Sequence, residues 1–113
     1  MINNVVLVGR LTADPELKEV GEGKVVNFTV ACQRSYKNAD GEYETDFIQC
    51  NVWNKVAENM KEYCHKGDVI VVKGSLQTAS YEDKEGNKKY KTDVRVDKVT
   101  FLSSKKGDVK DGE

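Results

Sequence analysis

The sequence predicts a small all-β domain that contains one short helix. Three observations support this fold class. The chain of 113 residues contains sixteen valines but only five leucines, and branched side chains pack well on a pleated sheet. Short segments alternate between apolar and polar residues, and turn signals rich in glycine, aspartate and asparagine separate them. Only one stretch has helical periodicity.

Two strands are predicted in the first third of the chain. Residues 4–11 (NVVLVGRL) form a short run that is apolar on both faces, which is typical of a central strand. Residues 24–34 alternate, so one face of this strand is assigned to the core. Asp40-Gly41 then predicts a hairpin turn.

The third predicted strand, 46–53, carries the main candidate binding residues. Its core face is formed by Ile48, Cys50 and Val52. Phe47 and Trp53 therefore point outward, among amide side chains. Large aromatic side chains that are exposed in a row usually have a binding partner.

The helical stretch is 54–66. Its core stripe is predicted to be Val56, Met60, Tyr63 and Cys64. Asn54 can cap the start of the helix, and Gly67 can adopt the left-handed conformation at its end. His65, in the last turn, would complement the helix dipole.

Two further strands and a tail follow. Residues 69–76 are typical of a central strand, and a long hairpin over 77–90 turns at 85–87. In the last strand the apolar residues change parity around Asp97-Lys98, which predicts a bulge or a bend. Residues 103–113 are mostly polar and predict a short disordered tail.

This order of elements predicts an OB-fold, a five-stranded Greek-key barrel, over residues 1–102. The helix would lie between the third and fourth strands of an antiparallel set, with long hairpins after the second and fourth strands. A parallel α/β sheet is excluded, because it needs a helix after most of its strands.

Charge and reactive side chains limit the function further. The chain has 18 Lys and Arg residues and 19 Asp and Glu residues, which gives a net charge of −1. Nucleic-acid-binding domains are typically basic, so the overall charge counts against this function. The three cysteines form no C-x-x-C pair and the chain has one histidine, so no metal or cofactor is expected. The cysteines are predicted to be reduced thiols in a cytoplasmic protein. No nucleophile elbow or phosphate loop occurs, and no enzymatic activity is predicted.

Binding of oligonucleotides fits the aromatic residues better. In OB-folds the usual oligonucleotide surface is the face of the second and third strands together with the two long hairpins. The predicted face carries two rings on the third strand and two at the bases of the hairpins, which are Phe47, Trp53, Tyr36 and Tyr81. Rings of this kind stack on any base, so they bind single strands without reading sequence. Nearby basic residues could contact phosphates, namely Arg34, Lys37, Lys55, Lys73, Lys88, Lys89 and Lys91.

Two other functions stay open on the residue pattern alone. The exposed rings could form a protein-interaction patch. The domain could also bind RNA, in which case the 2′-hydroxyl would be the discriminating group.

The chain resembles the bacterial and phage single-stranded DNA-binding protein family over residues 1 to about 102. The segments that carry the resemblance are NNVVLVGRLTADPEL, VVNFTVACQRSY, DFIQCNVWNKVAENMKEYCHKGDVIVVKGSLQT and SYEDKEGNKKY. The resemblance implies sequence-independent binding that protects and unfolds single-stranded DNA during replication, recombination and repair. It also implies a cytoplasmic, nucleoid-associated homotetramer in which the first strand joins subunits edge to edge.

The resemblance also assigns roles to individual residues. The positions that match base-stacking aromatics in the family are Tyr36, Phe47, Trp53 and Tyr81. The positions that match phosphate contacts are Lys18, Arg34, Lys37, Lys55 and Lys66.

The end of the chain departs from the family pattern. Typical members continue through a flexible linker into an acidic tip that recruits replication and repair enzymes, whereas this chain ends at Asp111-Gly112-Glu113. Recruitment of those enzymes is therefore not implied. A short paralogue, a phage-encoded version and a trimmed chain are all consistent with this ending.

Overall fold

The computed structural model describes residues 1–103, which form six strands and one helix. In chain order the elements are β1 (Val5–Leu11), β2 (Leu17–Val20), β3 (Gly23–Lys37), β4 (Tyr43–Trp53), α1 (Asn54–Tyr63), β5 (Val69–Glu82) and β6 (Lys88–Ser103). The predicted tail lies outside the described residues, apart from Ser103, which ends β6. The helix α1 has ten residues, and no described helix is long and apolar enough to cross a membrane.

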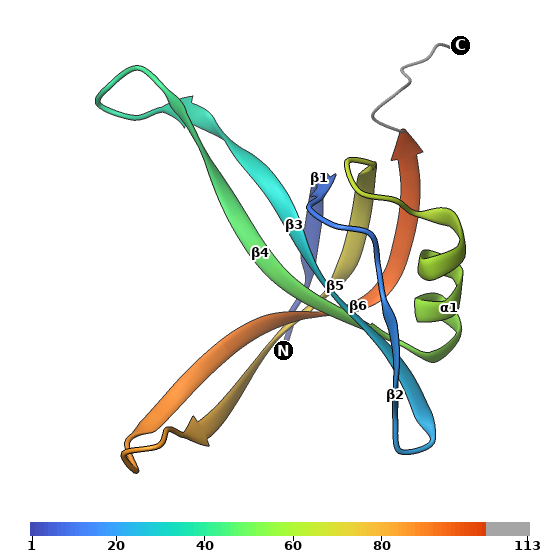
Figure 1. Ribbon diagram of the computed structural model, residues 1–113. Helices are drawn as coiled ribbons and strands as arrows, with labels where there is room; N and C mark the ends of the chain where they lie inside the picture. The colour runs from blue at the N-terminus through green and yellow to red at the C-terminus, as the bar shows by residue number, and fades with distance from the viewer. Residues whose placement is uncertain (104–113) are drawn as a thin grey trace.

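Five of these strands close into a barrel. Around it, β1 pairs with β5, β5 with β6, β6 with β4, β4 with β3, and β3 with the end of β1. The helix connects β4 to β5 and packs beside β3, β4 and β6 (Figure 1). This closed arrangement confirms the predicted five-stranded Greek-key barrel with one short helix.

Two features of the sheet differ from the prediction. First, β4 and β6 run parallel, with Cys50 opposite Val94 and Val52 opposite Val96, so the set is not wholly antiparallel. Parallel neighbours need a crossover connection in place of a hairpin, and α1 and β5 form that connection here. Second, the four-residue strand β2 pairs with the start of β3 through a turn at Gly21. So short a strand gives no periodic signal.

The core combines the inner faces of the strands with one face of α1. Its fully buried side chains include Val26, Val30, Val52, Ile70, Val72 and Met60. Tyr63 was predicted to join them, but it is 63% exposed. The helix ends at Tyr63, three residues earlier than predicted, and the chain continues in an extended conformation at Cys64.

The predicted ends of the helix are only partly correct. Asn54 does not cap the helix; it has a φ of 57°, and its Oδ1 accepts a hydrogen bond from the backbone N–H of Lys24 at 3.1 Å. Gly67 has the predicted positive φ of 90°, but in the turn that follows the helix. His65 also lies beyond the last helical residue, where its backbone N–H donates to Asp68 Oδ2.

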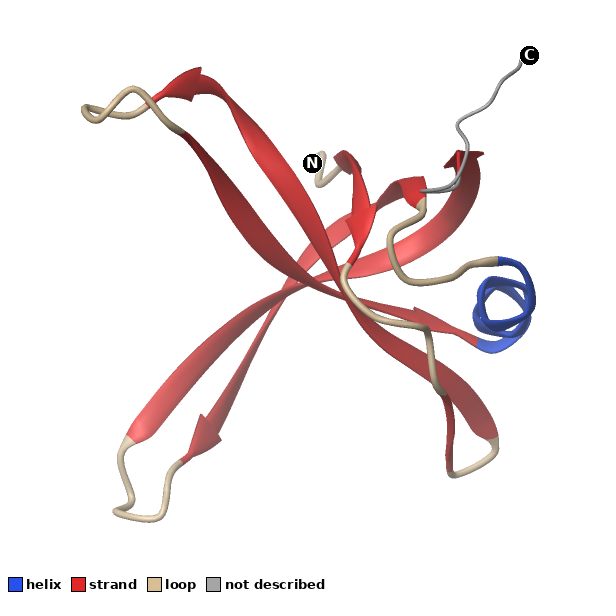
Figure 2. Cartoon of the chain, turned by 45° about the horizontal axis from the view of Figure 1, so that its top comes forward, coloured by secondary structure: helices blue, strands red, loops and turns tan. Residues whose placement is uncertain are grey.

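The two long hairpins extend well beyond the barrel as paired strands. They project on one side of the molecule and diverge from each other, with loops only at their tips (Figures 1 and 2). The β5–β6 ladder continues to the pair Glu82 and Lys88. Tyr36 and Tyr81 consequently lie near the tips of the hairpins and not at their bases, because the strands are longer than their apolar alternation indicated.

The predicted bulge in the last strand is confirmed. Lys73 pairs with Lys98 and Gly74 pairs with Val96, so Asp97 is the extra residue of β6. The backbones approach closely at this point. A Cβ atom on Gly74 would clash with the carbonyl oxygen of Arg95 and would lie 2.9 Å from the Cα of Val96.

Candidate nucleic-acid interface

The outward face of β4 carries two aromatic rings among amides, as predicted. Phe47 is 64% exposed and Trp53 is half-buried, whereas Cys50 and Val52 on the opposite face are buried. Six residues separate the two rings, so their Cα atoms are about 20 Å apart along an extended strand. A single strand of nucleic acid lying along β4 would meet both rings.

A row of hydrogen-bonding side chains crosses the sheet beside these rings. Strand register places Asn27 of β3 opposite Asn51 of β4, Asn51 opposite Arg95 of β6, and Arg95 opposite Ser75 of β5. We call these four residues the polar row. Because Asn51 lies between Phe47 and Trp53 on the same face, the row passes between the two rings.

Trp53 is held by two members of the polar row. Its Nε1–H donates to Asn51 Oδ1 at 3.1 Å, and the Arg95 guanidinium carbon lies 5.4 Å from the centroid of its ring. Arg95 was not among the site residues predicted from the sequence. The signal was present, because Val94 and Val96 belong to the core and alternation therefore turns Arg95 outward.

The two tyrosines extend the aromatic surface along different hairpins. Tyr81 is exposed and pairs with Lys89; it lies six residues from Ser75 on β5, so it shares the outward face of the polar row. Tyr36 is also exposed, but it lies within the register irregularity between Gln33 and Lys37. Strand parity therefore does not fix the face of Tyr36.

The predicted phosphate contacts are spread around this surface, and three of them are close to aromatic residues in register, in the chain or in space. Lys18 pairs with Val25, the β3 neighbour of Trp53, and Lys55 is the second residue of α1. Lys37 is exposed on the β3–β4 hairpin, with its Nζ 5.7 Å from the ring centroid of Tyr43.

Lys66 is not brought together with them. It lies beyond the far end of α1, and a helix of this length spans about 15 Å.

Arg34 is already engaged by two carboxylates. Its Nε and Nη2 donate to Asp46 at 3.0 and 2.9 Å, and its Nη1 donates to Glu44 at 2.9 Å. This hydrogen bonding raises the pKa of Arg34 and lowers that of Asp46. The depressed pKa means that the pair stabilises the hairpin above the unfolded pKa of Asp46, and that this contribution is lost as pH falls through the folded value. A phosphate at Arg34 would compete with both carboxylates.

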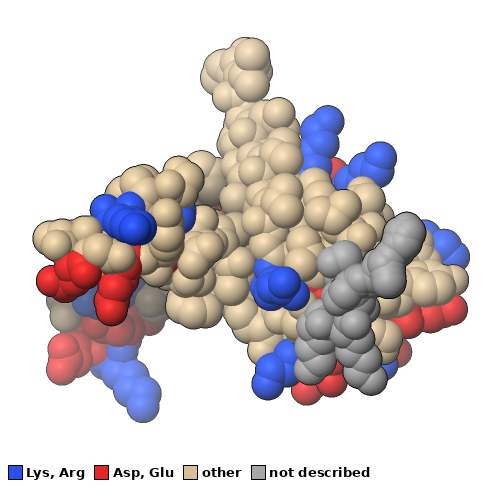
Figure 3. All heavy atoms as spheres, turned by 90° about the horizontal axis from the view of Figure 1, so that it is seen from above, with Lys and Arg blue, Asp and Glu red and all other residues tan. Residues whose placement is uncertain are grey.

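The remaining charges are mixed in sign. Lys89 lies 4.0 Å from Asp83 and Lys91 lies 3.8 Å from Asp93, so basic residues of the β5–β6 hairpin have acidic neighbours. Basic and acidic side chains are interspersed on the face seen in Figure 3, and much of the surface between them is uncharged. The candidate interface therefore presents rings and individual cations more than a continuous basic patch.

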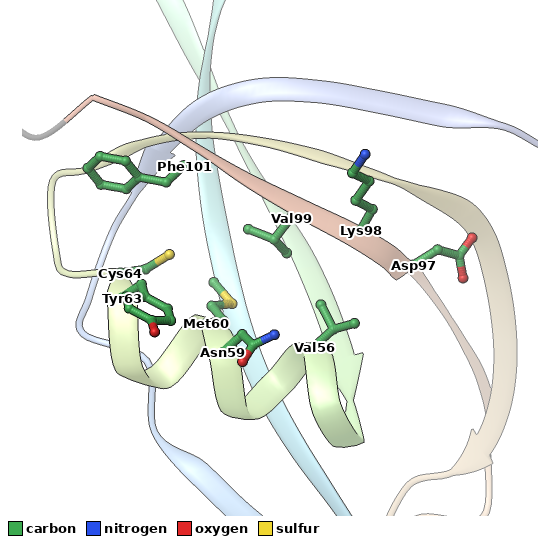
Figure 4. Close-up of a pocket in the computed structure, with 9 residues that line it drawn as sticks. All are labelled: Val56, Asn59, Met60, Tyr63, Cys64, Asp97, Lys98, Val99 and Phe101. Carbon is green, nitrogen blue, oxygen red and sulfur yellow. The ribbon is translucent and has the colours of Figure 1, made fainter.

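A separate hollow of about 350 Å³ lies between α1 and the end of β6 (Figure 4). Its walls are mostly apolar and include Val56, Met60, Tyr63, Val99 and Phe101. None of the residues predicted to bind DNA lines it. The hollow is therefore not part of the aromatic interface.

The cysteines have the properties of structural thiols. Burial raises the pKa of the Cys50 thiol to about 12, and it also raises the pKa values of Cys32 and Cys64. A raised pKa lowers the thiolate fraction and with it the reactivity. Within residues 1–103, no three His, Cys, Asp or Glu side chains are grouped so as to hold a metal ion.

Comparison with known proteins identifies relatives across nearly the whole chain. The model of the single-strand binding protein family matches residues 2–102. Single-stranded DNA-binding protein B of Bacillus subtilis is 48% identical over 106 residues, which cover 93% of this chain and 94% of that protein. Single-stranded DNA-binding protein 1 of Lactococcus lactis is 48% identical over 107 residues, which cover 94% and 71%. Single-stranded DNA-binding protein 1 of Staphylococcus aureus is 48% identical over 109 residues, which cover 96% and 70%.

Proposed function

Because this chain belongs to the single-strand binding protein family, we propose that it binds single-stranded DNA without reading its sequence. Bound protein would protect exposed strands and remove their secondary structure during replication, recombination and repair. The observation that carries this proposal is the pair of outward rings, Phe47 and Trp53, on one strand of an OB barrel. We propose that the protein acts in the cytoplasm, on the nucleoid, because its ligand is single-stranded DNA.

The proposed mechanism is binding without catalysis. Bases stack on Tyr36, Phe47, Trp53 and Tyr81, and each stack contributes about 1–3 kcal/mol. Phosphates are contacted by Lys18, Arg34, Lys37 and Lys55 around the aromatic surface and by Lys66 beyond the far end of α1. Each contact releases counterions and adds about 0.7 to the slope of log K against log salt. Since the net charge is −1 and Arg34 is held by carboxylates, we expect a shallower salt dependence than a continuous basic groove would give.

Titration with oligo(dT), followed by tryptophan fluorescence, tests this function directly. Trp53 is the only tryptophan of the chain, so any quenching reports on one ring. We expect strong quenching that saturates at a fixed ratio of nucleotide to protein, with weaker binding at higher salt.

A duplex of equal length is the control, and it should quench little because its bases are already stacked. Absence of binding at low salt would refute the proposal and leave the exposed rings to a protein partner. Tighter binding to poly(U) than to oligo(dT) would indicate an RNA-binding module.

We further propose that the protein assembles as a homotetramer through β1. Val6 and Val8 project from the outer face of this strand and are more than half exposed. In the described part of the chain, only Arg10 and Leu11 of β1 pair with β3, which leaves the ladder positions of Val5 to Val8 open along that edge. An apolar strand with an open edge is suited to pairing with another copy. Assembly would place several binding faces on one strand of DNA and raise its effective affinity.

Substitution Val8→Lys is expected to break this assembly. Light scattering should give about four times the 12.7 kDa chain mass for the native protein and a lower mass for the variant. The matched control is Val20→Lys, because Val20 of β2 is exposed to the same extent as Val8, 53% against 54%. A Val8→Lys protein that keeps the native mass would contradict assembly through this face.

A further inference from the structure

Trp53 differs from the other three candidate rings because neighbouring side chains hold its indole in place. The hydrogen bond from its Nε1 to Asn51 fixes the edge of the indole, and the guanidinium of Arg95 lies over one face. Among the described residues, no cation lies over Phe47, Tyr36 or Tyr81. Trp53 and Arg95 therefore form a unit, in which a cation lies over one face of a ring that is half exposed.

The guanidinium of Arg95 has donors to spare. Arg10 donates to the carbonyl oxygen of Gly67, and Arg34 donates to two carboxylates. Arg95 makes neither a side-chain hydrogen bond nor an ion pair within residues 1–103, although a guanidinium carries five N–H donors. The nearest acidic residue along β6 on this face is Asp93, which is approached by Lys91 at 3.8 Å.

We propose that Arg95 and Trp53 form one nucleotide subsite, in which a base stacks on the indole and Arg95 donates to the adjoining phosphate. This inference rests on the proposed function, which it extends to a residue with no assigned role. A guanidinium stays charged at all working pH values, and its planar fork matches two phosphate oxygens. Contact with the ring also limits the conformations of the long side chain, so less entropy is lost when a phosphate binds.

Substitution Arg95→Met removes the charge and keeps most of the length of the side chain. We expect oligo(dT) binding to weaken about tenfold at low salt, as for the loss of one charged hydrogen bond. The slope of log K against log salt should fall by about 0.7, the contribution of one phosphate contact on a single strand. Arg95→Lys should restore the slope and only part of the affinity, because an ammonium keeps the charge without the planar fork.

Lys98→Met is the matched control. Lys98 is also an exposed cation of β6, but it lines the hollow beside α1 (Figure 4). Its loss removes the same charge from the chain and should leave both affinity and salt slope within about twofold of the native values, since a charge outside the contact surface is largely screened. Thermal unfolding of each variant checks that the fold is intact.

Two results would overturn the subsite. Unchanged affinity and slope in Arg95→Met would show that the guanidinium does not reach phosphate. Tighter binding would show that Arg95 competes with the base for the ring. Either result, with the native protein still binding oligo(dT), would leave the proposed function in place. Failure of the native protein to bind would instead refute the function itself.

Discussion

Replacing Phe47 and Trp53 together by alanine is expected to weaken oligo(dT) binding by about 2–6 kcal/mol, because each stacked base contributes about 1–3 kcal/mol. The fold should survive, since Phe47 is exposed and Trp53 is half-buried outside the core cluster. The double variant contains no tryptophan, so fluorescence anisotropy of a labelled oligonucleotide is the appropriate measurement. The two single variants should each account for part of the loss.

Tyr43→Ala provides the control for ring position. Tyr43 is an exposed aromatic on the same strand, at its hairpin end, and it was not predicted to stack on bases. Its removal should change affinity by well under 1 kcal/mol, within the range usual for surface substitutions. A loss as large as that of Trp53→Ala would contradict the assignment of stacking to particular positions. A double variant that binds like the native protein would contradict stacking on β4 altogether.

The second large effect is expected at Gly74, where β5 passes the bulge of β6. A Cβ atom here would meet backbone, which cannot move aside as a flexible side chain can. We expect Gly74→Ala to lower the free energy of unfolding by about 3 kcal/mol or more, which is at or beyond the upper end of ordinary overpacking costs. Urea unfolding followed by circular dichroism measures this loss.

Gly86→Ala separates this clash from a general cost of replacing glycine. Gly86 lies in the turn of the same hairpin with a φ of 83°, and a Cβ atom there meets no neighbour. Its replacement should cost only about 1–2 kcal/mol, the penalty for an L-residue in a left-handed conformation. If Gly74→Ala proved no more destabilising than Gly86→Ala, the close approach at the bulge would not be a packing constraint.

The sequence predicted features that depend on local periodicity. Alternation alone placed Cys50 and Val52 inside and Phe47 outside, and the structure confirms these faces. The bulge at Asp97 was also visible, because an extra residue changes the parity of the apolar positions that follow. In both cases the signal comes from neighbours in the chain.

Features that depend on distant partners could not be predicted in the same way. Asn54 has the residue type of a helix cap, yet its side chain bonds to Lys24, thirty positions away. Tyr36 lies in a register irregularity of β3 that the pattern of apolar residues does not reveal. The role proposed for Arg95 depends on its place beside β4, which the parallel β4–β6 pairing creates.

The parallel pairing of β4 with β6 also bears on how quickly the chain can fold. α1 and the whole of β5 lie between the two partners in the chain, so their pairing brings together residues more than forty positions apart. The entropy of closing such a long loop must be lost before the contacts it permits are gained. Until β6 docks, β4 has an unpaired edge with Phe47 and Trp53 beside it, which is the kind of exposed strand that pairs with other chains. The strand that is proposed to hold DNA is therefore also exposed to self-association in the incompletely folded protein.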